Sequence, residues 1–107
     1  MSIYASSLKE DLDRVRRNIE TYRRRIMEFP AGSLMIRSIK GHDYIYLKYR
    51  KDGKVVQEYV SAFDQERYDR LQADIAQRKQ LQLELKNLLT EEKEMRKALR
   101  ALGEKDV

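Results

Sequence analysis

Residues 32–61 read GSLMIRSIKGHDYIYLKYRKDGKVVQEYVS, and they form the one long stretch of the chain without helical periodicity. Apolar and polar side chains alternate along it with the period of two that is typical of β-strands. Asp52-Gly53 has the residue types that a two-residue type I′ hairpin turn requires. Gly41-His42 is a weaker signal of the same kind. The stretch therefore predicts a three-stranded antiparallel meander with strands near 33–40, 43–50 and 54–60.

The two turns set the register of these strands. Ile36 then faces Leu47, and Tyr46 faces Tyr59. Because successive side chains point to opposite faces, the composition of each face follows from the register. The predicted core face carries Leu34, Ile36, Ser38, Ile45, Leu47, Tyr49, Val56, Glu58 and Val60. The opposite face carries Met35, Arg37, Ile39, Tyr44, Tyr46, Lys48, Arg50, Val55, Gln57 and Tyr59.

An amphipathic helix is predicted before the meander, beginning near residues 3–7 and ending at 29. Ser7 and Glu10 have the spacing of a capping box, and Pro30 cannot continue a helix. Apolar residues recur at alternating steps of four and three, which is the 3.5-residue period of a coiled-coil seam. The seam positions are Leu8, Leu12, Val15, Ile19, Tyr22, Ile26 and Phe29.

A second, longer helix is predicted from about 63 to 102, with Ser61 or Asp64 as its cap and a frayed tail at 103–107. At about 1.5 Å per residue it exceeds the first helix in length by well over ten residues. If the helices fold back antiparallel, its C-terminal part has no intrachain partner and exposes an apolar stripe. Such stripes usually contact another chain. We therefore expect a homo-oligomer, with a dimer favoured, through Met95, Leu99 and Leu102.

The predicted fold class is α+β, an antiparallel two-helix coiled-coil hairpin with the meander inserted between the helices. A chain of 107 residues predicts a single domain over 1–107. There is no cysteine, no apolar run of about 18 residues and no signal-peptide core. These features favour a cytoplasmic protein that does not enter a membrane.

The chain contains few of the side chains that enzymes commonly use for catalysis. His42 is the only histidine, and it lies in a predicted turn. One histidine and no cysteine cannot make a zinc site, and the four glycines do not form a phosphate-binding loop. We expect no enzyme activity, no metal, no cofactor and no small-molecule substrate.

The net charge of +5 is concentrated in the first helix and the meander, because residues 62–107 hold ten cations and ten acids. A localised excess of this kind favours an anionic partner. On the sheet, three cations and three tyrosines share one face, as in nucleic-acid-binding sheets whose cations meet phosphates and whose rings stack on bases. The candidate binding residues are Arg37, Tyr44, Tyr46, Lys48, Arg50 and Tyr59, helped by the helical arginines Arg16, Arg17, Arg23 and Arg24.

The segment from Pro30 to Ser61 resembles one in small uncharacterised bacterial proteins with a helix–meander–helix layout. The shared pattern comprises Gly32-Ser33, Lys40-Gly41, Tyr44-x-Tyr46-Leu47, Gly53-Lys54-Val55-Val56 and Tyr59-Val60. The same segment is similar to a strand-rich stretch near the start of some transposases. That resemblance implies a DNA-contacting element, while the catalytic acids of transposases have no counterpart in this chain.

The sequence is compatible with three functions. A nucleic-acid-binding accessory module, with DNA favoured, explains the basic tyrosine-rich face. A coiled-coil assembly or adaptor protein explains the helical seams without any nucleic acid. The layout of two helices joined through β-hairpins is also similar to a prefoldin subunit, and this resemblance implies a chaperone.

Overall fold

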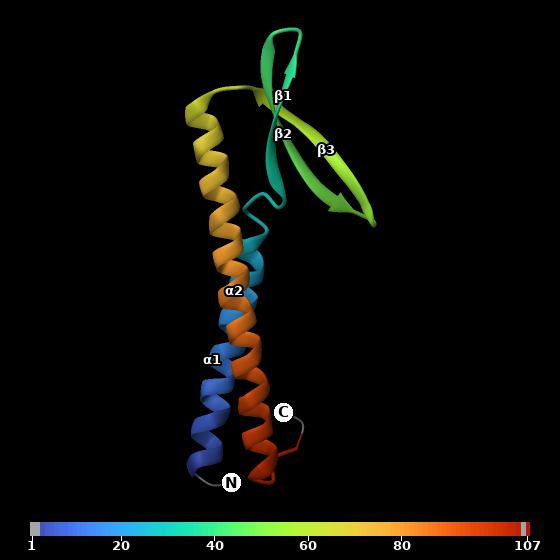
Figure 1. Ribbon diagram of the computed structural model, residues 1–107. Coiled ribbons are helices and arrows are strands. Elements are labelled where there is room, and N and C mark those ends of the chain that lie inside the picture. Colours follow the sequence, from blue (N-terminus) through green and yellow to red (C-terminus); the bar gives the residue numbers. More distant parts are fainter. Residues whose placement is uncertain (1–2, 106) are drawn as a thin grey trace. The chain divides into compact units, whose positions relative to one another are not determined.

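The computed structural model of the protein describes residues 3–105 and 107 (Figure 1). It confirms the predicted α+β class, with a three-stranded antiparallel sheet inserted between two helices. Helix α1 ends three residues earlier than predicted, and each of the other boundaries lies within two residues of the predicted one. The elements are α1 (Ile3–Ile26), β1 (Ser33–Ile39), β2 (His42–Lys51), β3 (Lys54–Ala62) and α2 (Gln65–Ala101).

The chain divides into two compact units. One comprises Met1–Met27 and Gln80–Val107, and the other comprises Glu28–Lys79. Helix α2 contributes residues to both units. A single domain over 1–107 stays a prediction. Neither helix has, over the residues that the structure describes, an apolar segment long enough to cross a bilayer.

In the first unit, α1 and the C-terminal part of α2 run side by side and antiparallel (Figure 1). Lys9 Nζ lies 2.9 Å from a carboxylate oxygen of Glu104, and Arg16 Nε lies 3.3 Å from one of Glu92. Residue numbers thus rise on one helix as they fall on the other. The α1 seam is buried or half-buried at every position from Ala5 to Ile26, as its period predicts. Its buried residues are Ala5, Leu12, Val15, Ile19 and Ile26.

The expectation that Met95 and Leu99 lack an intrachain partner is wrong. Leu99 is fully buried in a cluster with Ala5 and Leu12, and Met95 packs against that cluster. Leu102 is 49% exposed and is the one member of the predicted stripe that stays accessible. This stripe therefore no longer supports an oligomer, and the oligomeric state itself stays a prediction.

The error lies in which part of α2 was predicted to lie beside α1. The prediction placed the first residues of α2 beside the last residues of α1. In the structure the residues near the end of α1 lie beside the middle of α2, as the side-chain hydrogen bond between Tyr22 and Glu84 shows. The N-terminal part of α2, residues 65–79, belongs to the unit with the sheet, whereas its C-terminal part belongs to the unit of α1.

Helix α2 ends in a Schellman motif. Glu104 N–H donates to the Leu99 carbonyl at 3.0 Å, and Gly103 N–H donates to the Arg100 carbonyl at 3.0 Å. Gly103 supplies the left-handed backbone that this motif needs, with φ of 88°. The predicted frayed tail is wrong at two described residues, because Glu104 pairs with Lys9 and Val107 packs on the helical core. Position 106 lies outside the described residues.

In the second unit, the strands lie in the order β1-β2-β3. The Asp52-Gly53 turn is confirmed, with φ of 52° and 77°. The first turn is Lys40-Gly41, at 53° and 80°, and not the predicted Gly41-His42. Ile36 therefore faces Ile45 and not Leu47. The predicted pairing was wrong by two residues, and because side chains alternate with period two, each residue keeps its predicted face.

A bulge interrupts the pairing of β2 with β3. Tyr46 pairs with Tyr59 as predicted, but Ile45 pairs with Ser61, which leaves Val60 as an extra residue in β3. Ser61 is therefore a buried strand residue, 8% exposed, and not a helix cap. Asp64 holds the cap position of α2, where its carbonyl accepts a bond of 2.9 Å from Tyr68 N–H.

Candidate nucleic-acid interface

The six sheet residues predicted to bind nucleic acid occupy three neighbouring strands of the second unit. Arg37 lies on β1, Tyr59 lies on β3, and Tyr44, Tyr46, Lys48 and Arg50 follow one another at every second position of β2. At about 3.4 Å per residue, neighbours in this β2 row are about 7 Å apart. Strand alternation places this row on one face of the sheet, as predicted, and Arg37 and Tyr59 share that face because they pair with Tyr44 and Tyr46. We call the face formed by these six residues the tyrosine face.

Three rings form a cluster at the end of this face nearer to the first turn. The Tyr59 ring lies 6.2 Å from Tyr44 and 5.8 Å from Tyr46, between ring centres, with interplanar angles of 55° and 74°. These tilted and edge-on geometries are the favourable ones for aromatic pairs. Tyr44 and Tyr46 are half-buried, whereas Tyr59 is 56% exposed. The cluster therefore presents one ring to solvent and supports it with two others.

A cation completes the cluster. The Arg37 guanidinium carbon lies 5.0 Å from the centre of the Tyr46 ring, within the range of a cation–π contact. The same side chain donates to Gln57 Oε1 at 3.5 Å. Sequence reasoning placed Gln57 on this face but did not identify it as a partner of Arg37, because β2 lies between the strands that carry the two residues.

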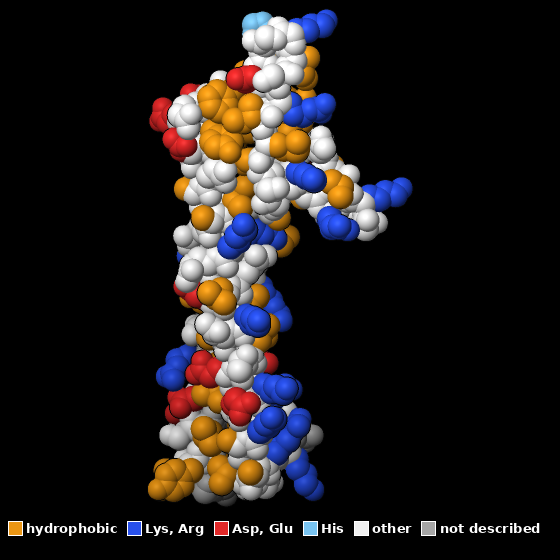
Figure 2. All heavy atoms as spheres, viewed as in Figure 1, with side chains coloured by type: hydrophobic (Ala, Val, Ile, Leu, Met, Phe, Trp, Pro, Cys, Tyr) orange, Lys and Arg blue, Asp and Glu red, His pale blue; other side chains and the backbone are white. Residues whose placement is uncertain are grey.

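The other end of the tyrosine face carries Lys48 and Arg50, both exposed. Within the described residues, neither has a carboxylate at ion-pair distance. Figure 2 shows Lys and Arg side chains on the β2–β3 hairpin beside hydrophobic ones. Unpaired cations beside aromatic rings are suited to an anion that also carries a flat apolar group.

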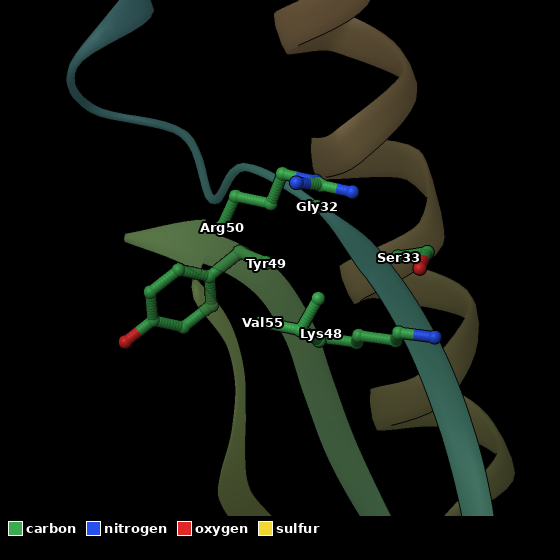
Figure 3. Close-up of a pocket in the computed structure, with 6 residues that line it drawn as sticks. All are labelled: Gly32, Ser33, Lys48, Tyr49, Arg50 and Val55. Carbon is green, nitrogen blue, oxygen red and sulfur yellow. The ribbon is translucent and has the colours of Figure 1, made fainter. Parts of the chain in front are cut away.

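Lys48 and Arg50 also line an open hollow of about 370 Å³ (Figure 3). Their side chains extend toward Gly32 and Ser33 at the start of β1, whereas Tyr49 points to the opposite side of the strand. The lining residues are Gly32, Ser33, Lys48, Tyr49, Arg50 and Val55. Two of these residues are cations and none is an acid, and the hydroxyl on the side of the two cations is that of Ser33. Sequence reasoning assigned no role to Gly32 or Ser33 in binding.

The β1 wall of the hollow depends on a close approach of two backbones. Gly32 has φ of 102°, and a Cβ atom at this position would lie 2.2 Å from the Lys48 carbonyl oxygen. Real Cβ atoms do not come this close to another heavy atom, so only glycine fits. Ser33 then pairs with Lys48 in the sheet register.

The four helical arginines predicted to assist belong to the other unit. Arg16 is paired with Glu92, and Arg23 Nη1 lies 3.2 Å from Glu20 Oε1. Arg17 and Arg24 are exposed. The sheet residues and the helical arginines therefore belong to different units of the chain. The Arg16–Glu92 pair is half-buried, whereas the Arg23–Glu20 pair is exposed. Exposed ion pairs contribute little free energy, so Arg23 can exchange its carboxylate for a phosphate at small cost.

Among the described residues, no three or more histidine, cysteine, aspartate or glutamate side chains are grouped so that they could hold a metal ion. His42 is an exposed residue at the start of β2 and not a turn residue, in contrast to the prediction. It pairs with Ile39 across the first hairpin.

No protein-family model matches this chain, and neither does a curated protein or a solved structure. The candidate interface must therefore be judged on its own geometry and charge.

Proposed function

We propose that this protein is a non-enzymatic nucleic-acid-binding accessory module, with DNA as the favoured partner, and that the tyrosine face is its binding surface. The observation that carries the proposal is the continuity of this face. A supported and exposed ring, Tyr59, is followed along the sheet by two cations without acid partners among the described residues, Lys48 and Arg50.

Each half of the face supplies one of the two terms that nucleic-acid binding needs. Cations that neutralise phosphates release condensed counterions, which gives affinity without sequence preference. Aromatic rings add base stacking, typically about 1–3 kcal/mol per base, and every base has a face that can stack. Arg37 supports the ring cluster and adds a third cation at its edge.

The test is fluorescence anisotropy with a labelled duplex and a labelled single strand at two salt concentrations. The affinity is expected to fall steeply with salt, because each phosphate contact contributes about 0.7 to 0.9 to the slope of log K against log salt. Replacing Arg37, Lys48 and Arg50 together by alanine is expected to weaken binding and to flatten this slope by up to about three.

A matched control removes the same charge elsewhere. Arg67, Lys79 and Lys86 are exposed residues of α2 that do not lie on the sheet. The triple alanine variant at these positions is expected to bind nearly as the parent does. The proposal fails if the parent binds neither probe more tightly than about 100 μM at low salt, the weak limit of non-specific affinity. It also fails if the two triple variants lose affinity equally.

A further inference from the structure

The hollow at the end of the tyrosine face has a more specific role than charge alone would give it. We propose that it is the subsite for one backbone phosphate of the bound strand, held jointly by Lys48, Arg50 and the Ser33 hydroxyl. This inference rests on the proposed function, because it assigns a position within the same surface to one group of the nucleic acid.

The chemistry of the lining fits a phosphate group. A guanidinium presents several N–H donors in one plane and binds phosphate oxygens two at a time, while an ammonium adds a compact charge. Ser33 pairs directly with Lys48 and adds a hydroxyl that can donate a third bond. With Val55 as an apolar part of the lining, a volume of about 370 Å³ has room for a phosphate with part of its sugar.

The position of the hollow on the sheet also suits a backbone phosphate. Lys48 and Arg50 are two residues apart on β2, and their side chains extend to the same side, toward the Gly32–Ser33 segment (Figure 3). The close backbone approach at Gly32 holds that segment beside Lys48. Tyr46 lies two residues before Lys48 on β2, a distance of about 7 Å. A base on the ring cluster and a phosphate in the hollow can therefore belong to one nucleotide or to two neighbours.

A shared phosphate has a signature that separate contacts lack. If Lys48 and Arg50 each met a different phosphate, removing both would reduce the salt slope for a single strand by about 1.4. If they hold the same phosphate, the double variant loses one contact, and the slope falls by about 0.7. The affinity losses of the two single variants will then be non-additive, as for residues that share a partner.

The experiment compares two double-mutant cycles on the full chain with labelled hexathymidine. One cycle uses Lys48→Gln and Arg50→Gln, and the other uses Lys40→Gln and Lys54→Gln, two exposed lysines at the first and second turns, at opposite ends of β2 and outside the lining. We expect the first cycle to be strongly non-additive and the second to be additive with smaller losses. Ser33→Ala is expected to weaken binding roughly twofold to tenfold, the value of one hydrogen bond.

Inorganic pyrophosphate, followed by amide NMR shifts, separates this inference from the proposed function. We expect pyrophosphate to shift the amide signals of Gly32 and Ser33 in the parent and not in the variant that combines Lys48→Gln with Arg50→Gln. If hexathymidine binds but the two cycles behave alike, the phosphate subsite is wrong and the proposed function stands. If pyrophosphate binds the hollow but neither oligonucleotide nor duplex binds, a free phosphorylated compound is the ligand, and both the proposed function and the backbone phosphate are wrong.

Discussion

The Arg37 guanidinium lies 5.0 Å above the Tyr46 ring and at the same time donates to Gln57. It therefore covers one side of Tyr46, whose ring also meets Tyr59 edge-on. Tyr59 is the ring of the cluster that remains most open to solvent. The stacking role on the tyrosine face thus falls mainly to Tyr59, and Tyr44 and Tyr46 hold it in place.

Replacing Tyr59 by alanine is expected to reduce affinity for a single strand by roughly fivefold to 150-fold, the value of one stacked base. Tyr59→Phe keeps the ring and is expected to bind as the parent does. Tyr4→Ala removes a tyrosine that is 78% exposed on α1 and serves as the matched control. Anisotropy titrations measure all three, and equal losses for Tyr59→Ala and Tyr4→Ala would refute the stacking role.

Two glycines with similar backbone angles are expected to differ in their tolerance of a side chain. At Gly41 an added Cβ meets no atom within 4 Å, so Gly41→Ala loses about 1 kcal/mol through its left-handed backbone alone. At Gly32 the Cβ also meets the Lys48 carbonyl, and we expect a loss of about 3 kcal/mol. Urea unfolding of both variants checks this, and equal midpoints would contradict it.

Burial predicts opposite results for two leucines near the end of α2. Leu99→Ala is expected to destabilise the protein by about 2–5 kcal/mol, because it leaves a cavity beside Ala5 and Leu12. Leu102→Ala, at a half-exposed position, is expected to change the free energy of unfolding by about 0.5 kcal/mol or less. Urea unfolding measures both.

Light scattering on the same samples tests the oligomer separately. A dimer that loses mass on Leu102→Asp would show that the exposed end of the predicted stripe is an interface after all. A parent that scatters as a monomer at tens of micromolar would end the prediction of a homo-oligomer.

The contact of Tyr22 with Glu84 gives a prediction about alkaline pH. The hydrogen bond that the phenol donates to the carboxylate raises the pKa of Tyr22 above its ordinary value of 10.0, with desolvation as the second cause. The raised pKa means that the neutral phenol stabilises the folded state below pH 10, and this stabilisation is lost as pH rises through the raised value. Glu84→Gln is expected to lower the pKa of Tyr22 toward 10.0.

An NMR titration of the Tyr22 ring carbons measures this pKa directly. Glu91→Gln removes an exposed carboxylate from the same helix and is expected to leave the pKa of Tyr22 unchanged. An unshifted value in Glu84→Gln would show that the hydrogen bond does not join the two helices in solution.

The tyrosine face could be predicted because strand alternation is a local property. The first turn was predicted one residue too far along, since glycine was assigned to the first central position. Both turns instead have glycine second, after Lys40 and after Asp52. This order is the one that type I′ turns favour, so the signal was present. The error moved the pairing by two residues, and an even shift leaves every face intact.

The hollow could not be predicted in the same way. It depends on the backbone of Gly32 approaching the Lys48 carbonyl, and these residues are brought together by the β1–β2 pairing and not by the spacing of residues in the chain. The bulge at Val60 is a second such feature. It places Ser61 opposite Ile45 through the packing of the sheet, and no local pattern marks it.

The sequence by itself determined the elements, the two faces of the sheet and the seam of α1, because each follows from periodicity within a single segment. Only the tertiary structure decided how α2 is aligned with α1. A seam with a 3.5-residue period repeats every seven residues, so it fits its partner at several offsets. The chosen offset buries Leu99 against Leu12 and sets Arg16 beside Glu92, and these contacts between distant residues exist only once the helices have met.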